Sequence, residues 1–469
     1  MEGVLYFILI LGGMIVIHEF GHFIVAKLFG IRVEVFSIGF GKRLFGTKKG
    51  DTDYRVSLIP LGGYVKMSGE NLDEQRTGAD YEFMSKPRWQ RLLVAVAGPF
   101  MNVLTAFTII AVLAMIHFET DAYRTWPAQV NAVEPGSPAE KAGMRRGDLI
   151  VKIDGEENPL WRDVEDAILV NPGQTIPVTV KRNDQTIDLS LPVASRPFEQ
   201  EEIGYAGFKP DIGSDAKLIV KAVGKEKPGA QAGLQPGDQI VGVNDKPVEQ
   251  SPYGNLDVIS AIRASNGQPV TLIVKRGGET LPITAAPQMD DGEYRLGFEP
   301  DLIDVQKIVT KLGPVEAAKF SIQENKRILK LTWKAISQMF AGQRSPGKTL
   351  TGPIGILSIT QEATERGAWS LFNLTALLSL NLGIFNLLPI PVLDGGLIFM
   401  LLLESILGVF GVPLSLRVKE RMMQVGFVVL ILLMGFVILN DIAKKFPSAP
   451  QQQQQQQPKQ DAPPAGEKP

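Results

Sequence analysis

The sequence predicts a polytopic α-helical membrane protein that carries a water-soluble module between its spans. Long apolar stretches lie near both ends of the 469-residue chain, and a polar region of roughly 250 residues separates them, whereas about 20 apolar residues suffice to cross a bilayer. A His-Glu-x-x-His motif lies inside the first apolar stretch, and the polar region contains an internal repeat. These three observations together favour a membrane protein with a metal site at membrane depth.

Composition narrows the possible functions. Lys and Arg number 48 and Asp and Glu number 50, so the net charge of −2 gives no indication of nucleic acid binding. The chain has no cysteine, which excludes disulfides and cysteine–zinc sites. Any metal ion must therefore be held by His, Asp or Glu.

Four membrane-spanning segments are expected, and the third is broken. The first helix should cover residues 1–30, the second 92–118 and the fourth 423–440. The third segment, 371–410, contains the sequence Pro389-Ile-Pro-Val-Leu-Asp-Gly-Gly396, whose prolines and glycines should interrupt a helix. Irregular backbone at membrane depth is tolerated only where it is buried or lines a cavity.

The distribution of basic residues predicts the orientation of the spans. The loop after the first span is rich in Lys and Arg, and cytoplasmic loops carry an excess of these residues. The N-terminus should therefore lie outside and the loop 31–91 in the cytoplasm. Alternation of spans then places both the soluble module and the C-terminus outside the cytoplasm as well.

The loop 31–91 is expected to form a small β-sheet at the cytoplasmic membrane surface. Residues 32–38 alternate between apolar and polar, and residues 54–59 and 64–67 flank a Pro-Leu-Gly-Gly sequence that is typical of a hairpin. The sheet could be a structural plug. Alternatively, its edge could capture an unwound substrate by strand addition, through the residues Tyr64, Val65, Lys66 and Met67.

The polar middle of the chain contains two copies of one pattern, 90 residues apart. Residues 133–155 recur as residues 223–245, and in both copies a Gly-Asp pair precedes a strand-like run. We therefore expect two similar modules, at 126–212 and 218–303.

The repeated pattern Ala-Gly-x-x-x-Gly-Asp-x-Ile resembles that of PDZ domains. Gly207 and Phe208, and Gly297 and Phe298, resemble the carboxylate-binding loop and peptide-binding strand of that fold. They lie at the end of each repeat, so the resemblance implies two tandem, circularly permuted PDZ domains of the α+β class. Such domains bind extended peptides at a sheet edge. Alternatively, the grooves of these two domains bind no peptide, and the domains act only through their size.

Two further segments follow the repeats. Residues 314–345 have the pattern of an amphipathic helix, which would lie on the outer membrane face or pack on a PDZ domain. A glycine- and proline-rich connection follows at 342–355. The tail 447–469 contains seven consecutive glutamines and is expected to be disordered.

The motif in the first span predicts a hydrolytic metal site. On a helix, His18 and His22 share one face, and Glu19 could act as general base on a metal-bound water. Catalytic zinc usually takes three protein ligands. Asp394, at the break in the third span, is the best candidate for the third, although it could instead cap the following helix, and Glu404 is a weaker candidate.

Two polar residues of the second span are less diagnostic. Asn102 could hydrogen-bond to a neighbouring helix or support the active site. His117, at the far end of the span, could be an interfacial residue or a metal ligand.

The motifs taken together resemble the site-2 protease family of intramembrane zinc metalloproteases. They are His18-Glu-Phe-Gly-His22, Gly98-Pro-x-x-Asn102, Gly352-Pro-Ile-Gly355 and Asn386-x-x-Pro-x-Pro-x-Leu-Asp-Gly395, with the tandem PDZ-like repeats between them. The resemblance implies one Zn²⁺ per chain, bound by His18, His22 and Asp394, with Glu19 as general base. It also implies that Asn386 and Pro391 contact the substrate.

The resemblance further implies a function in the bacterial inner membrane, with the active site near the cytoplasmic side. Family members make the second cut in regulated intramembrane proteolysis, here of an envelope stress response. The expected substrate is a single-span protein such as an anti-sigma factor, already trimmed by a site-1 protease; remnant signal peptides are a second class. The alternatives are a membrane-anchored PDZ adaptor and a metal-binding sensor without proteolytic activity. Partners are then the substrate and the lipid bilayer, with no nucleic acid.

Overall fold

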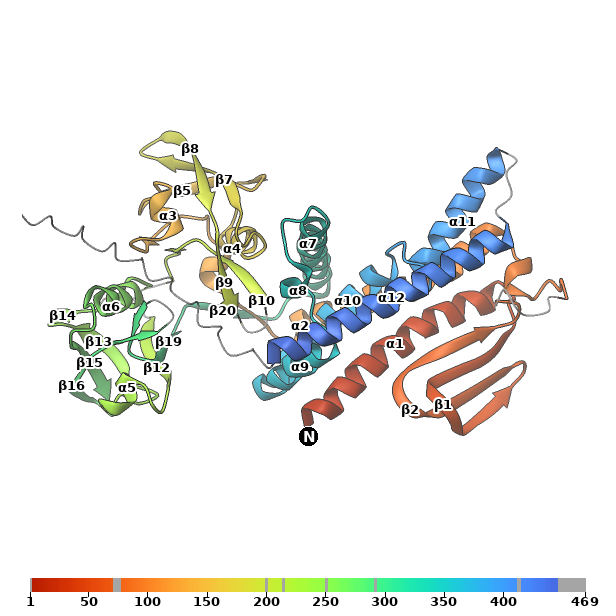
Figure 1. Cartoon of the computed structure of the whole chain (residues 1–469), viewed down its shortest axis with the longest axis horizontal. Helices are drawn as coiled ribbons and strands as arrows, with labels where there is room; N and C mark the ends of the chain where they lie inside the picture. Colours follow the sequence, from red (N-terminus) through yellow and green to blue (C-terminus); the bar gives the residue numbers. More distant parts are fainter. Residues whose placement is uncertain are drawn as a thin grey trace, which may run out of the picture.

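The computed structural model describes residues 2–70, 77–198, 201–212, 216–248, 252–290, 293–410 and 415–445. The molecule is elongated: long helices and a small sheet form one end, and two β-rich modules form the other (Figure 1). In the described ranges, four helices are long and apolar enough to cross a membrane. The glutamine-rich tail predicted to be disordered lies outside the described residues.

The four apolar helices agree with the four apolar segments of the sequence. They are α1 (Glu2–Leu28), α2 (Arg88–Ile116), α10 (Ala368–Asn386) and α12 (Leu416–Lys445). The third segment is interrupted as expected: α10 ends at Asn386, and the chain resumes a helix only at α11 (Asp394–Val409).

Glycines allow α2 to pack closely between two neighbouring helices. A β-carbon at Gly21 of α1 would lie 2.3 Å from the carbonyl oxygen of Ala97, and one at Gly383 of α10 would lie 3.0 Å from that of Pro99. The hydroxyl of Ser379 donates to the carbonyl of Asn102 at 2.9 Å. The motif residues of three helices are thereby brought to one level of the bundle.

The loop after α1 forms a sheet, but not with the predicted pairing. It consists of β1 (Val33–Lys49) and β2 (Thr52–Met67), joined by a turn at residues 50–51 and preceding the short helix η1 (Phe83–Ser85). Residues 33–38 pair with 63–67 on one edge and with 53–56 on the other. The predicted hairpin between 54–59 and 64–67 is therefore wrong, because β1 lies between these two segments.

The bend at residues 60–63 follows the surface of α1 instead of closing a tight hairpin. A β-carbon at Gly12 would lie 2.8 Å from the carbonyl of Pro60, and one at Gly62 would lie 3.0 Å from the side chain of Ile15. At its other end the sheet shares a small core with α1 that includes Ala26. The sheet thus lies along half the length of α1, beside the helix rather than at its end (Figure 1).

The first β-rich module lies between η2 (Ala122–Thr125) and residue 212. A four-stranded sheet of order β6-β5-β7-β8 and two short ribbons, β4–β11 and β9–β10, enclose one apolar core. Its elements are β4 (Ala132–Val133), α3 (Pro138–Lys141), β5 (Leu149–Ile153), β6 (Glu156–Glu157), α4 (Trp161–Leu169), β7 (Thr175–Arg182), β8 (Gln185–Pro192), β9 (Ala194–Phe198), β10 (Glu201–Tyr205) and β11 (Phe208–Lys209).

The second module repeats the order of elements with a core of its own. Its main sheet has the order β16-β15-β13-β12-β19, with β14 paired to β13, and β17 and β18 form a ribbon. Its elements are β12 (Lys217–Val223), α5 (Pro228–Gln231), β13 (Gln239–Val243), β14 (Lys246–Pro247), α6 (Pro252–Ala264), β15 (Val270–Arg276), β16 (Glu279–Ala285), β17 (Gln288–Asp290), β18 (Glu293–Arg295) and β19 (Phe298–Ile303).

The repeated Gly-Asp pair has the same structural role in both modules. Buried Asp148 accepts hydrogen bonds from Arg182 and from the amide of Arg145. Buried Asp238 likewise accepts from Arg276 and from the amide of Gln235. Each aspartate thus ties its own turn to the last residue of a sheet strand, β7 or β15.

The two modules are attached to the helices through a two-stranded neck. The strand β3 (Phe118–Asp121), directly after α2, pairs antiparallel with β20 (Lys307–Thr310), directly before α7. The modules also touch each other, since Arg263 of the second donates to Glu134 of the first at 2.7 Å.

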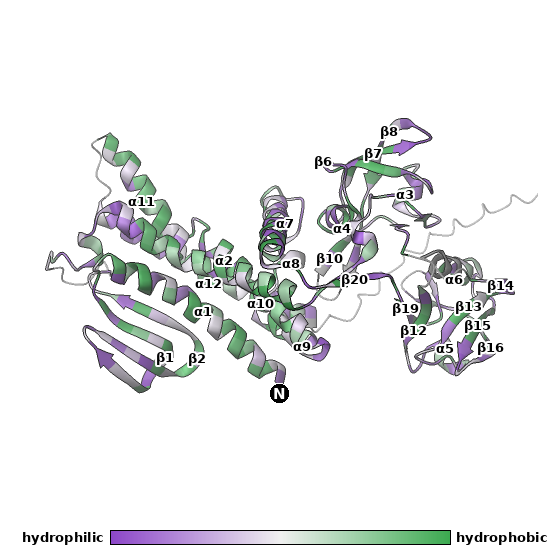
Figure 2. Cartoon of the chain, turned by 180° about the vertical axis from the view of Figure 1, so that it is seen from behind, coloured by the Kyte–Doolittle hydropathy of each residue, from purple (hydrophilic) through white to green (hydrophobic). Residues whose placement is uncertain are grey.

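The helix α7 (Pro314–Phe340) packs on the first module, which is one of the two arrangements that its amphipathic pattern allows. Its charged face pairs with the module: Arg327 contacts Asp166 at 2.5 Å, and Lys334 pairs with Asp154. Its apolar side chains Phe320 and Ile328 pack against α2 and α10. In Figure 2, α7 shows both hydrophilic (purple) and hydrophobic (green) residues, and it lies between the modules and the hydrophobic helices.

A helix that the sequence analysis missed follows α7. After the short α8 (Pro346–Thr349), α9 (Pro353–Arg366) begins inside the segment predicted to be a connection. Buried Asp441 of α12 accepts hydrogen bonds from the amides of Gly352 and Gly355 at 3.0 and 2.9 Å. The Gly-Pro-Ile-Gly motif therefore starts a helix whose first amides are held by α12.

Asp238→Asn should lower the free energy of unfolding of the second module by about 2 kcal/mol, because a neutral amide replaces the charged acceptor of Arg276. Hydrogen exchange of the full chain in detergent at neutral pH measures this as lost amide protection in residues 216–303. Asp304→Asn is the control, since its pair with Lys217 lies at the surface and such pairs contribute little. Equal protection in both variants would contradict the assigned role.

The difference in free energy of unfolding between wild type and Asp238→Asn should become smaller in acid. Burial alone would raise the pKa of Asp238, but hydrogen bonds from Arg276 and Gln235 outweigh it and hold the pKa below its usual value. A depressed carboxyl pKa stabilises the folded state above the unfolded-state pKa and stops doing so as the pH falls through the folded pKa. The difference between wild type and Asp238→Asn, followed by chemical denaturation, should therefore shrink below about pH 4.

Candidate metal centre

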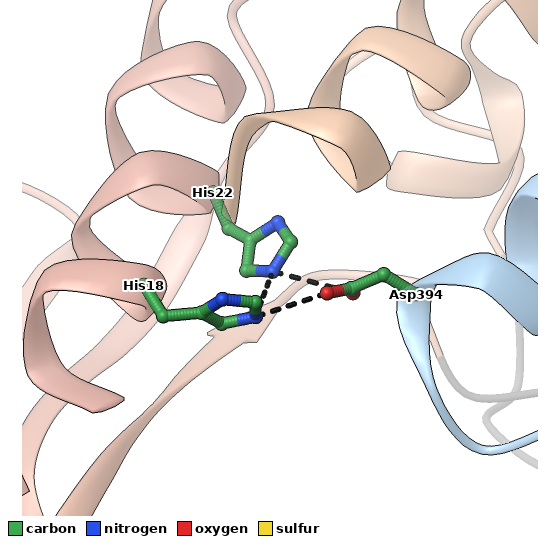
Figure 3. A group of neighbouring side chains, drawn as sticks. All are labelled: His18, His22 and Asp394. Atoms are coloured by element: carbon green, nitrogen blue, oxygen red, sulfur yellow. Dashed lines mark hydrogen bonds and ion pairs between the residues drawn. The ribbon is translucent and has the colours of Figure 1, made fainter. Parts of the chain in front are cut away.

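Three side chains from distant parts of the sequence converge at the break between α10 and α11. His18 and His22 project from one face of α1, and Asp394 from the first turn of α11 (Figure 3). The Nε2 atoms of the histidines lie 3.2 Å apart, and the Asp394 carboxylate lies 2.9 Å from that of His18 and 3.3 Å from that of His22. Among the described residues, only this His/Asp/Glu group has the spacing of a metal site.

Both histidines direct Nε2 to the centre because Nδ1 has a partner elsewhere. The Nδ1 of His22 lies 2.7 Å from the carbonyl of Val94, which can only accept, so the proton belongs on Nδ1. The Nδ1 of His18 lies 3.1 Å from the amide nitrogen Nδ2 of Asn102, whose buried Oδ1 has no hydrogen-bond partner, so the amide is better turned over. With the amide turned so that Oδ1 faces the ring, Asn102 fixes the same tautomer in His18.

The arrangement fits a tetrahedral metal ion. Two ligands of a tetrahedral zinc ion at about 2.1 Å lie about 3.4 Å apart, close to the separations between the two Nε2 atoms and Asp394. Two imidazoles and one carboxylate are a ligand set that zinc commonly takes at catalytic sites, with a fourth position left for water or substrate.

The chain approaches this centre so closely that only glycine fits at several positions. A β-carbon at Gly98 of α2 would lie 2.3 Å from Nε2 of His22 and 2.7 Å from that of His18. At the break, β-carbons at Gly395 and Gly396 would lie 2.1 and 2.4 Å from the carbonyl oxygens of Leu388 and Ile390. The glycine pair lets residues 387–393 fold back over the start of α11, which positions Asp394.

Backbone strain is present at the same place. Val392 has a φ of +88°, a conformation that is costly for a β-branched residue. Its side chain lines the cavity of the centre. Strained backbone of this kind is concentrated at functional sites.

A cavity of about 470 Å³ opens at the centre, and its wall includes the candidate base and the sheet edge. Glu19 lines it, and its Oε2 accepts a hydrogen bond from the amide of Val65 at 3.0 Å. The complete lining is Ile15, His18, Glu19, His22, Tyr64, Val65, Met67, Glu70, Phe83, Val94, Ala95, Leu382, Asn386, Val392, Leu393, Asp394 and Leu397.

The structure brings most of the predicted site residues together, with exceptions. Asn386 lines the cavity with its amide 3.4 Å from Nε2 of His18. Pro391 does not line it but packs against Gly426 of α12, and Lys66 turns away to pair with Glu34 at 2.9 Å.

Two other candidates for metal ligands lie outside the centre. Glu404 pairs with Lys419 at 3.1 Å and with Arg88 at 3.7 Å. His117 lies 3.0 Å from Glu119 and contacts the ring of Trp369, at the start of the neck.

The two predicted peptide grooves differ. In the first module, Gly207 and Phe208 line a cavity of about 360 Å³ next to α4, and burial there lowers the pKa of Lys209. In the second module, the side chain of Lys227 covers Gly297 and pairs with Asp290 at 2.7 Å, while Phe298 packs on the module core.

Several residues of the site were missed by reasoning from the sequence. The carbonyl of Val94 carries no sequence signal. Gly98 was noted only as part of a motif, whereas its role depends on how closely α1 crosses α2. Glu70 is an ordinary loop residue by sequence, and only the fold brings it to the cavity.

The comparison with known proteins agrees with this geometry. A model of peptidase family M50 matches residues 6–433, so the chain belongs to this family. It is 34% identical over 456 residues to the regulator of sigma-E protease RseP of Escherichia coli, covering 93% of this chain and 98% of that protein. A putative zinc metalloprotease of Neisseria meningitidis is 31% identical, covering 95% and 99%.

Among the solved structures that match is one that covers part of the chain. It is the PDZ domain of an SdrC-like protein from Listeria monocytogenes, which covers 18% of this chain and 84% of its own at 22% identity, with a TM-score of 0.16.

Gly98→Ala should weaken metal binding by about ten- to a hundredfold without unfolding the chain. The added β-carbon would displace both imidazoles from the centre, and disturbing the supports of metal ligands typically costs ten- to a hundredfold in affinity. Metal per purified chain, measured by mass spectrometry, tests this. Gly13→Ala is the matched control, since nothing lies within 4 Å of its β-carbon. Full metal content in Gly98→Ala would contradict the geometry.

Proposed function

We propose that the chain is a zinc endopeptidase that cuts a single-span protein within the bacterial inner membrane. The observation that carries the proposal is the convergence of Asp394 with His18 and His22 beside Glu19, where both histidines lie on a helix apolar enough to cross a bilayer. Membership of peptidase family M50 supports the reaction class, and relatives named as zinc metalloproteases support the metal. The ligand set supports one ion per chain.

In this proposal each residue has a separate role. His18, His22 and Asp394 hold the ion, which supplies Lewis acidity and an acidified water when bound. Glu19 accepts a proton from the attacking water and returns it to the leaving amine. Asn102 and the Val94 carbonyl orient the two imidazoles, and Asn386, which lines the cavity, contacts the substrate backbone.

The substrate would bind as an added strand. A peptide bond in a helix is hidden by its own hydrogen bonds, so the segment must unwind before cleavage. Residues 64–67 form the edge of the sheet that faces the cavity, and no other described strand pairs with that edge. Adding the unwound segment there would satisfy its backbone groups away from water.

In place of the position at the cytoplasmic membrane surface expected from the sequence, the sheet is proposed to lie at membrane depth, on the cytoplasmic half of the protein. It runs along α1 as far as Gly12. Large apolar side chains are exposed at its far end, where the bilayer would cover them: Ile38, Phe40, Leu44, Phe45, Leu58, Ile59 and Leu61. The basic residues that follow α1 support a cytoplasmic location of this loop, with both termini and the modules on the periplasmic side.

The two modules are proposed to be permuted PDZ domains, at 126–212 and 218–303, that filter substrates by size. They are attached through the β3–β20 neck directly after α2, at the end of the molecule opposite the β1–β2 sheet (Figure 1). An intact outer domain would collide with them, whereas a stub trimmed by a site-1 protease would pass. Relatives named as regulators of sigma-E protease support an anti-sigma factor as the substrate in an envelope stress response.

Glu19→Gln should abolish cleavage of a single-span substrate in detergent while the chain retains its metal. Loss of a general base typically slows a reaction by about 10²–10⁴-fold. Asp394→Asn should lose both metal and cleavage, and Glu404→Gln, a carboxylate of the same helix, should keep both. An adaptor or a sensor instead predicts that wild type binds zinc and cleaves nothing.

Removing both modules should allow cleavage of a substrate whose outer domain is intact. Lys307 pairs directly with Asp121, so a two-residue Asn-Gly turn can replace residues 122–306 without disturbing the neck. Cleavage of trimmed and untrimmed substrate is compared in one assay, with metal content as the control for folding. Continued rejection of the untrimmed substrate would refute the size filter.

A further inference from the structure

Two carboxylates already occupy the open edge of the β1–β2 sheet. The amide of Val65 donates to Glu19 Oε2 at 3.0 Å, and the amide of Met67 donates to Glu70 Oε2 at 3.2 Å. Backbone groups of residues two apart on a strand point to the same side. Val65 and Met67 therefore carry the amides of residues 64–67 that face away from β1.

These two contacts lie in the cavity of the metal centre. Glu19 and Glu70 both line it, together with Val65 and Met67. Exposed sheet edges in natural proteins are commonly protected by charged side chains against unwanted pairing. Here the protected edge is the one that faces His18, His22 and Asp394.

One amide hydrogen makes only one strong hydrogen bond. A substrate strand that pairs with the edge must therefore take the Val65 amide from Glu19 and the Met67 amide from Glu70. At Val65 this exchange frees the carboxylate of Glu19 as the substrate arrives. At Met67 the exchange displaces the side chain of Glu70, which has no role in the proposed cleavage reaction.

We propose that Glu70 is a specificity-determining residue that holds the Met67 amide until an extended substrate displaces it. The proposal rests on the proposed function for the nature of the incoming strand. Glu70 follows Met67 by three residues, so its displaced carboxylate stays beside the bound strand. It therefore disfavours an acidic substrate side chain opposite Met67 and accepts a neutral or basic one.

Binding of a peptide to the metal-free full chain tests the proposal without cleavage. The probe is a fluorescent single-span peptide with glycines at its centre, in detergent, measured by anisotropy. Glu70→Ala should tighten binding about fivefold, because the substrate no longer competes with a charged acceptor. Glu70→Gln should lie between it and wild type. A version of the peptide with one aspartate opposite Met67 should gain more from Glu70→Ala than the neutral peptide.

Glu34→Ala separates edge competition from support of the sheet. Glu34 lies in the same sheet but bonds the side chains of Ser68 and Lys66, not an outward amide, so its removal should not tighten binding. Unchanged or weaker binding in Glu70→Ala, with metal uptake equal to wild type, would overturn the proposal.

The outcomes also separate this proposal from the proposed function. A wild type that cleaves its substrate, combined with no gain in Glu70→Ala, defeats the role of Glu70 alone. A chain that binds the peptide more tightly in Glu70→Ala, yet never cleaves when zinc is restored, defeats the peptidase and leaves the edge assignment intact.

Discussion

The approach of two imidazole nitrogens to 3.2 Å is the constraint on which the membrane half of this structure depends. Each Nδ1 is directed to a partner of its own, and with the Asn102 amide turned toward His18 through Oδ1, both Nε2 atoms present lone pairs to each other and to the Asp394 carboxylate. Such an array of acceptors is stable in a buried site only when a cation or a proton lies between them. The surrounding helices must therefore hold three ligands in place against their mutual repulsion.

The helices do so by packing more closely at three glycines than a residue with a β-carbon would readily allow. Gly21 permits contact with the carbonyl of Ala97, Gly98 leaves room for both imidazoles, and Gly383 brings α10 against Pro99. In a bilayer, lipid tails offer no hydrophobic drive for helix association, and small residues that allow close approach replace it. The same glycines that appear in the sequence motifs thus serve the site by removing side chains.

Much of the site could be predicted from the sequence, because its chemistry is unusual at membrane depth. His18, His22 and Asp394 stand out as ionisable groups in apolar stretches, where such groups are costly. The repeat of the two modules could be predicted from their shared Gly-Asp pairs. The structure gives the reason for these pairs, since Asp148 and Asp238 each tie a turn to the end of a strand. The pairing of the sheet could not, since residues 33–38 alternate in a way that fits a neighbour on either edge, and contact with α1 decides the outcome.

Helix α9 and the role of Glu70 were beyond sequence reasoning for a related reason. The start of α9 is stabilised by Asp441, almost 90 residues away, and no local pattern encodes such a partner. Glu70 has meaning only once residues 64–67 face the cavity. In both cases a carboxylate accepts hydrogen bonds from backbone amides. Asp441 is distant in the sequence from the amides it accepts, whereas Glu70 lies three residues from Met67 and gains its role only from the position of that strand edge.

The first module and the centre are connected by packed elements. The first module binds the charged face of α7 through Arg327 and Lys334. On its other side, α7 contacts α2 through a hydrogen bond from Ser321 to the Phe107 carbonyl, and α10 through Thr332 and Asn381. These are the two helices that carry Asn102 and Asn386. A displacement of the first module by an oversized substrate would therefore move α7 first. Through α7 it would shift α2 and α10, the helices whose asparagines contact His18.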